Sequence, residues 1–289
     1  MRIAILREHS LSPKKALLDR QRSWAQRIGA VSDSRGYLSS VEANLFQPLS
    51  ERTRRAFSNG CGSELIDTFH RPAKMKALHS SAALAVNVFD YWAERDSSQV
   101  VVSLGLGMAP ASLAFEAQFP TGLEGNPPNL DLALRFASEM VVGMESKFSE
   151  WLTPRSPRKE HFKAKYFPEG QSLWANSGLR AAQELAAALH NGEERFRYLD
   201  AVQLLKHMLG LANTHRGKSA LYYLFYEWPS EESSIHRAEL KRFQGLIARD
   251  MPFHWGTYQQ VFQRLAQLVE REHGQYIRYL RQRYFADAV

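Results

Sequence analysis

The chain lacks several features that define large protein classes. Cys61 is the only cysteine among its 289 residues, which excludes an internal disulfide and any zinc site built from several cysteines. No apolar run reaches the roughly 18 residues of a membrane span, and the N-terminal apolar run is too short for a signal peptide. The sequence also contains no internal repeat. We therefore expect a soluble, cytoplasmic globular protein.

The composition is that of an ordinary globular protein with a basic balance. Hydrophobic residues make up 44% and charged residues 23% of the chain, which is long enough for a substantial core. There are 37 Lys and Arg against 30 Asp and Glu, which gives a formal net charge of +7. This balance is compatible with a nucleic-acid partner, although many basic proteins bind no nucleic acid.

Hydrophobic periodicity predicts helices and short strands in a mixed order. Helices are predicted over residues 11–28, 72–95, 179–190, 196–211 and 230–284, the last interrupted around 252–256. Short apolar runs bounded by Gly and Pro predict strands over residues 100–106, 112–119, 130–136, 140–148 and 219–228. The last run is almost continuously apolar, as in a strand buried on both faces. This order predicts an α/β fold with helices on both sides of a mixed sheet.

Acidic residues and a lysine lie at the ends of two predicted strands. Asp131 begins one apolar run just after a proline pair, and Glu145-Ser146-Lys147 closes the next run. Residues i and i+2 of a strand point to the same side of a sheet, so Glu145 and Lys147 share a face. If the two strands pair, Asp131 approaches them. The alternative is a pair of exposed strand ends with solvated charges.

Two carboxylates and an amine at one point fit metal-assisted chemistry at a phosphate. Mg²⁺ prefers a few carboxylates together with water and phosphate oxygens, and Asp131 and Glu145 would supply the carboxylates. The carbonyl oxygen of Ser146 is a candidate third ligand. Lys147 would stabilise charge at the phosphate or position the attacking water. We expect Mg²⁺ as the cofactor, with Mn²⁺ as the alternative.

These residues resemble the motif of the PD-(D/E)XK nuclease superfamily, which has the restriction-endonuclease-like fold. A closer resemblance, to a group of bacterial restriction endonucleases, rests on residues 115–116, 120–123, 127–131, 145–148 and 203–207. The resemblance implies that Asp131, Glu145 and Lys147 bind the metal and act on the phosphodiester. One departure is that Asn129 and Leu130 separate Pro128 from Asp131, whereas the motif has the proline and the acid adjacent.

Four further residues are candidate auxiliary members of the site. Superfamily members often carry another acid near the start of the core, and Glu64 and Glu116 are the candidates here; the alternative is an ordinary charge at a helix start or strand edge. Members also bring a Gln or Lys from the helix after the Glu-x-Lys strand. Gln203 and Lys206 share one face of that predicted helix, and the alternative is an exposed helix face.

A basic connection follows the Glu-x-Lys strand. Its cations are Arg155, Arg158, Lys159, Lys163 and Lys165. They form either a solvated loop or an arm that follows DNA phosphates beside the site. His207, His215 and His254 are interpreted as scattered polar residues rather than a zinc cluster.

The sequence as a whole predicts a metal-dependent DNA endonuclease with a role in restriction or phage defence. We expect a helical N-terminal portion over residues 1–95, a nuclease core over 96–230, and a helical C-terminal portion over 231–289 packed on the core. The alternative from a different class is a DNA-binding or assembly protein with a degenerate nuclease fold. RNA is a weaker alternative substrate. A homodimer stays open, because restriction enzymes often dimerise to cut both strands.

Overall fold

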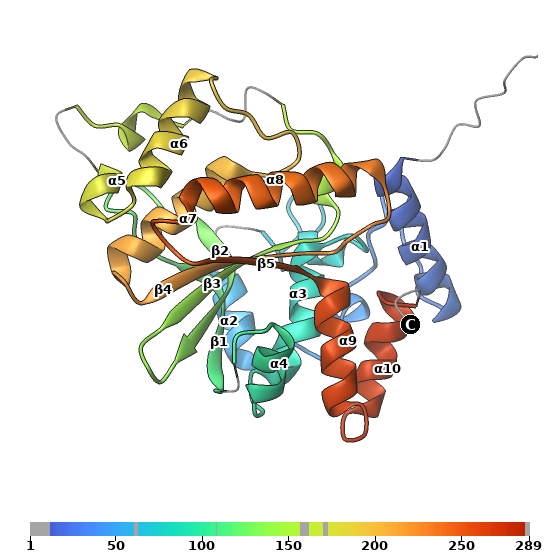
Figure 1. Ribbon diagram of the computed structural model, residues 1–289. Helices are drawn as coiled ribbons and strands as arrows, with labels where there is room; N and C mark the ends of the chain where they lie inside the picture. The colour runs from blue at the N-terminus through green and yellow to red at the C-terminus, as the bar shows by residue number, and fades with distance from the viewer. Residues whose placement is uncertain (1–11, 61–62, 108, 157–161, 170–172, 287–289) are drawn as a thin grey trace, which may run out of the picture.

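The computed structural model of the chain describes residues 12–60, 63–107, 109–156, 162–169 and 173–286 (Figure 1). Its centre is a sheet of five strands in the spatial order β1-β2-β3-β4-β5. The strands are β1 (Ala111–Gln118), β2 (Asn129–Phe136), β3 (Val141–Lys147), β4 (Ser219–Phe225) and β5 (Phe253–Thr257). The predicted α/β fold with a mixed sheet flanked by helices is confirmed.

The sheet changes from antiparallel to parallel at β3. β1 pairs antiparallel with β2, and β2 with β3, whereas β3–β4 and β4–β5 are parallel pairs. Short connections can join antiparallel neighbours, but parallel neighbours need a crossover, usually helical. The crossover from β3 to β4 ends in α7, and that from β4 to β5 contains α8.

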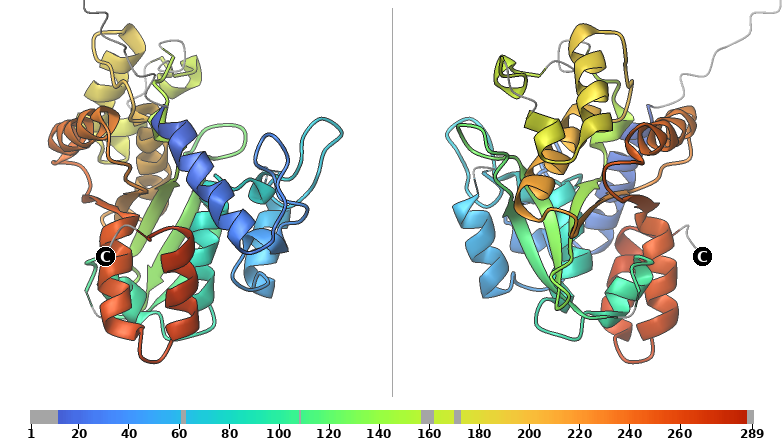
Figure 2. Two further views of the ribbon diagram at one scale, coloured as in Figure 1. Left: turned by 90° about the vertical axis from the view of Figure 1, so that its right-hand side faces the viewer. Right: turned by 60° about the vertical axis from the view of Figure 1, so that its left-hand side comes forward.

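Helices cover both faces of the sheet. In Figures 1 and 2, α5 to α8 lie on one face, and α2, α3, α4, α9 and α10 lie on the other. The helices are α1 (Pro13–Arg27), α2 (Glu51–Asn59), α3 (Ser81–Phe89), α4 (Ser98–Ser103), α5 (Leu173–Asn176), α6 (Arg180–Asn191), α7 (Ala201–Thr214), α8 (Glu231–Ile247), α9 (Tyr258–Val269) and α10 (Gly274–Arg283). None of the helices in the described part of the chain combines the length and the apolar character that a bilayer span requires.

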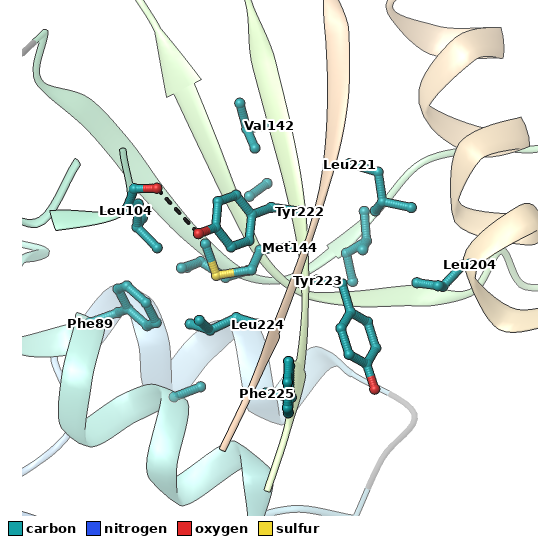
Figure 3. Close-up of a cluster of buried hydrophobic side chains, with 14 of the residues drawn as sticks. Phe89, Leu104, Val142, Met144, Leu204, Leu221, Tyr222, Tyr223, Leu224 and Phe225 are labelled. Carbon is teal, nitrogen blue, oxygen red and sulfur yellow. Dashed lines mark hydrogen bonds between the residues drawn. The ribbon is translucent and has the colours of Figure 1, made fainter. Parts of the chain in front are cut away.

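The central strand β4 is buried along its whole length, as its apolar sequence predicts. Figure 3 shows its side chains alternating between the two faces of the sheet. Leu224 lies beside Phe89 of α3, and on the same side Tyr222 donates a hydrogen bond to the carbonyl oxygen of Leu104; Tyr223 points to the other side, where Leu204 of α7 lies. Both layers of helices therefore pack on this strand. β4 is the buried centre of the sheet, and β3 pairs with it in parallel.

One predicted strand is wrong, and one strand was not predicted. Residues 100–106 were predicted as a strand, but they belong largely to the helix α4, whose Val100 and Val101 are fully buried. α4 packs against α9, which covers its apolar side; this tertiary contact outweighs the strand preference of Val. The interruption at 252–256 is the strand β5, which no strand pattern in the sequence predicts. β5 lies in the otherwise helical C-terminal portion and extends the sheet.

Two predicted helices begin later than their periodicity indicates, because a capping side chain sets each start. Ser80 accepts a hydrogen bond from the backbone N–H of Ala83, so α3 starts at Ser81. Asp200 accepts from the backbone N–H of Gln203, so α7 starts at Ala201. The boundaries predicted at residues 95 and 230 stay predictions, and one hydrophobic cluster draws residues from all three portions.

Gly210 lets α7 approach the end of β1 closely. A Cβ at this position would lie 2.4 Å from the backbone carbonyl oxygen of Phe119, and backbone atoms cannot move aside cheaply. We expect Gly210→Ala to lower the free energy of unfolding by about 1–3 kcal/mol, because the overpacking outweighs the better helix propensity of Ala. The matched control is Gly245→Ala in α8, where nothing lies within 4 Å. That variant should gain about 0.5–1 kcal/mol in urea unfolding. Equal stabilities for the two variants would contradict the close approach.

Candidate active site

β2 and β3 bring Asp131 next to Glu145 and Lys147. The register pairs Leu132 with Met144, which places the preceding Asp131 beside the following Glu145. The backbone N–H of Ser146 donates a hydrogen bond of 2.7 Å to Oδ2 of Asp131. Nζ of Lys147 donates to Oε1 of Glu145 over 2.5 Å. The predicted acid, Glu and Lys therefore converge at the carboxyl end of β3.

Helix α7 completes this cluster from the adjacent face. Nζ of Lys147 donates a hydrogen bond of 3.2 Å to Oε1 of Gln203, so the structure brings Gln203 to the site as predicted. One turn further along, Nε2 of His207 lies 3.0 Å from Oε2 of Glu145. The interpretation of His207 as a scattered polar residue is therefore wrong. Its spacing of four from Gln203 was the available signal, because residues i and i+4 share a helix face.

Lys206 lies away from this cluster. Its ammonium sits 5.4 Å from the ring centre of Phe162 and 5.3 Å from that of Tyr166, a cation–π arrangement. Burial lowers the pKa of Lys206, and the positive charges of Lys163 and Lys165 lower it further. The structure therefore places Lys206 with the basic connection rather than beside Glu145.

The two carboxyl groups of the cluster have opposite pKa shifts. Burial, followed by the negative charge of Glu145, raises the pKa of Asp131 well above its usual value. Burial also raises the pKa of Glu145, but the positive charge of Lys147 and the nearby His207 outweigh it and lower the pKa to about 2. Lys147 loses hydration, yet the charges of Glu145 and Asp131 raise its pKa and keep it protonated. The cluster thus has an ionised Glu145–Lys147 pair beside a carboxyl group that favours its neutral form.

Glu116 lies on β1, next to Asp131 of the neighbouring strand β2. The pairs Phe115–Leu132 and Ala117–Leu130 flank it on β1 and β2, so Glu116 is opposite Asp131 in the register. Its φ of +48° is in the left-handed region, which is uncommon for a residue other than Gly. Nδ2 of Asn129 donates a hydrogen bond of 2.6 Å to Oε2 of Glu116.

Glu64 reaches the same acidic region from the segment between α2 and α3. Its carboxylate forms an ion pair of 3.0 Å with Lys74, and burial raises its pKa. Burial also raises the pKa of Glu116, and the charges of Glu64 and Glu145 contribute to that shift. Glu116 in turn raises the pKa of Asp131, so Glu116 acts electrostatically on the cluster and Glu64 acts on Glu116.

The basic connection is only partly described. Arg155 forms an ion pair of 2.5 Å with Asp200 at the start of α7, and its backbone N–H donates to the carbonyl oxygen of Arg197. Lys165 donates to the carbonyl oxygen of Glu124, and the side chain of Lys163 is exposed. The predicted contacts of Arg158 and Lys159 fall outside the described residues.

The carboxylate oxygens of Asp131 and Glu145 are the kind of ligand that a hard divalent cation prefers. Oε2 of Glu145 is buried, and no described residue gives it a well-aligned hydrogen bond, since the nearby ring of His207 is poorly oriented for one. A buried carboxylate oxygen without such a partner is costly unless another cation satisfies it. Among the described residues, no group of three or more His, Cys, Asp or Glu side chains is arranged to hold a metal. Asp131 and Glu145 would therefore need water, backbone or phosphate oxygens as the remaining ligands, as Mg²⁺ commonly does.

The fold and this cluster define the class of the protein. An antiparallel β1–β3 meander that continues into parallel β4, with an acid, a Glu and a Lys where β2 meets β3, is the restriction-endonuclease-like arrangement. The chain belongs to the family described as Restriction Endonuclease associating with ARP, whose model matches residues 20–285. No curated protein and no solved structure matches the chain. Membership of this family indicates a nuclease-like role and DNA binding.

Proposed function

We propose that the protein is a metal-dependent endonuclease that hydrolyses phosphodiester bonds in DNA, with a role in restriction or phage defence. The observation that carries this proposal is the convergence of Asp131, Glu145 and Lys147, with one oxygen of Glu145 left without a well-aligned hydrogen bond. A degenerate nuclease fold has no need to keep this charged set together in a buried place, where unpaired charges are costly.

Each residue of the cluster has a role that follows from its contacts. Asp131, Glu145 and the carbonyl oxygen of Ser146 would hold Mg²⁺ or Mn²⁺. When bound, such an ion lowers the pKa of water and neutralises charge that develops on the phosphate. Lys147 is held by Glu145 and Gln203, so its ammonium points to a fixed place where it can donate to a phosphate oxygen. His207 supports Glu145 from α7 and acts as a positioning residue.

The proposal is tested by incubating the purified protein with plasmid DNA, single-stranded DNA and RNA in the presence of Mg²⁺ or Mn²⁺. We expect metal-dependent cleavage of DNA that EDTA abolishes. Binding of DNA without cleavage under any of these conditions would instead support a DNA-binding or assembly protein. Cleavage of RNA alone would change the substrate class.

We propose that the exposed Lys163 and Lys165 contact the DNA backbone. Both lie in the connection after β3, and both act electrostatically on Lys206 of α7. We expect the double variant Lys163→Gln/Lys165→Gln to bind duplex DNA more weakly, whatever its sequence. The log–log slope of affinity against salt should flatten by roughly 1.8, because each lost phosphate contact removes about 0.9.

The measurement is fluorescence anisotropy with a labelled duplex over a salt series. The matched control is Lys14→Gln/Lys15→Gln on α1, which removes two exposed cations on another side of the molecule (Figure 1). An equal slope change in both double variants would show that only net charge matters. An unchanged slope would assign Lys163 and Lys165 to a solvated loop.

A further inference from the structure

A fully exposed aromatic side chain stands at the tip of the segment between α2 and α3. Phe69 is 97% exposed, more than any other large hydrophobic side chain in the described part of the chain. Its ring makes an edge-on contact with the neighbouring His70, with the ring centres 4.9 Å apart. Figure 2 shows this segment projecting from the body of the molecule. An aromatic ring held in water has a large surface available for a ligand.

The turn that carries Phe69 is held by its own hydrogen bonds. The backbone N–H of Thr68 donates to the carbonyl oxygen of Arg71 over 2.8 Å, and the reverse bond spans 3.3 Å. Asp67 accepts from the backbone N–H of Ala73 over 2.7 Å and from Nζ of Lys76 over 2.8 Å. The turn is therefore fixed with Phe69 pointing away from the protein.

The base of the turn is anchored in the core beside the candidate active site. Met75 is fully buried, and its backbone N–H donates to the carbonyl oxygen of Glu64 over 3.0 Å. The segment begins at Gly60, where a Cβ would lie only 3.1 Å from Oε2 of Glu116, and Glu116 lies opposite Asp131. Phe69 thus stands at the tip of a hydrogen-bonded segment, and the base of this segment lies beside Glu116.

The charges around Phe69 favour a nucleic acid as the ligand. Lys74 neutralises Glu64, and Lys76 neutralises Asp67. Arg71 is exposed two residues after Phe69, so the tip presents an aromatic ring together with a cation. This combination matches a base stack and the phosphate beside it.

A protein partner fits the tip less well. Ile66 is the other large hydrophobic side chain exposed on this segment, at 66%. A stable protein interface buries roughly 800 Å² on each partner, which two isolated side chains do not supply. A wedge between base pairs, by contrast, needs one side chain.

We propose that Phe69 inserts into the base stack of the DNA beside the scissile phosphate, with Arg71 on a neighbouring phosphate. This inference rests on the proposed function, because it places DNA across the candidate active site. The inserted ring opens one base step and fixes the position of the duplex relative to Asp131, Glu145 and Lys147. The wedge therefore determines where the duplex is cut.

The test uses duplexes that contain 2-aminopurine, a base whose fluorescence rises when it is unstacked. The cleavage position is first mapped with the wild-type protein and Mg²⁺, and 2-aminopurine is then placed in turn at each flanking base pair. Binding is measured with the full chain carrying Glu145→Gln, so that the duplex stays uncut. We expect a several-fold rise in fluorescence at one step, its loss with Phe69→Ala, and its retention with Phe69→Trp.

The matched control is Val31→Ala, which removes another exposed apolar side chain, 82% exposed, from a different segment. It should leave the fluorescence rise unchanged, whereas Phe69→Ala should also weaken duplex binding about tenfold. A fluorescence rise that persists in Phe69→Ala would overturn the proposed wedge. The proposed function would still stand in that case if the wild-type protein cleaves DNA. If the wild type neither binds nor cuts DNA, both fall. If Phe69→Ala instead dissociates a dimer in sedimentation without changing the fluorescence, the tip is a protein interface and the wedge is wrong.

Discussion

Replacing Glu145 with Gln is expected to reduce Mg²⁺-dependent DNA cleavage by at least a thousandfold, or about 4 kcal/mol in the activation barrier. The substitution keeps the size and shape of the side chain but removes the charge that would attract a divalent cation. It also removes the ionic partner of Lys147, whose ammonium then loses its fixed position. We expect a loss of similar size for Asp131→Asn, because it removes the second carboxylate of the cluster.

The control for these variants is Glu139→Gln. Glu139 lies in the turn between β2 and β3, is 76% exposed and pairs with the exposed Lys218, so its loss should leave cleavage unchanged. Circular dichroism and urea unfolding would show that all three variants fold. Full activity of a folded Glu145→Gln or Asp131→Asn variant would refute the assignment of the site.

Replacing Lys147 with Met is expected to reduce the rate of cleavage about a hundredfold to a thousandfold, while metal binding persists. Met keeps the apolar stem of the side chain and removes the ammonium that would stabilise charge on the phosphate, an effect worth roughly 3–4 kcal/mol in comparable sites. The carboxylates of Glu145 and Asp131 remain, so the ligands of the metal are intact.

Calorimetry with Mn²⁺ separates the two roles of Lys147, because it reports metal binding independently of cleavage. The control is Lys218→Met, which removes a lysine that is 58% exposed at the opposite end of the strands. If Lys147→Met loses metal binding together with cleavage, the lysine holds Glu145 in place and its role is structural.

The local part of the candidate site follows from the amino-acid order alone. The two-residue period of a strand puts Glu145 and Lys147 on one face, whatever the rest of the fold does. The Gly and Pro residues around 110–128 delimit two apolar runs that pair as β1 and β2, and short connections make antiparallel pairing of β1, β2 and β3 the simplest arrangement. The approach of Asp131 to Glu145 follows from that pairing.

The contacts between distant segments depended on the tertiary structure. A helical period shows that Gln203 and His207 share a face, but only the packing of α7 on β3 turns that face toward Glu145 and turns Lys206 toward Phe162 and Tyr166. In the same way, the left-handed backbone of Glu116 arises inside a paired strand, where no glycine or turn signal marks it.

The missed elements have the same physical cause. The Val-rich run 100–106 has a strand preference, yet it forms α4 because α9 covers it, and β5 forms because the edge of β4 is available to it. Local preferences are worth a fraction of a kcal/mol per residue, and burial against a distant segment outweighs them. The pattern of residues therefore determined the strands β1 to β4, and the acids and the lysine of the cluster. The fold decided which helix faces complete the cluster and that Phe69 stands exposed, because those outcomes depend on packing between segments far apart in the chain.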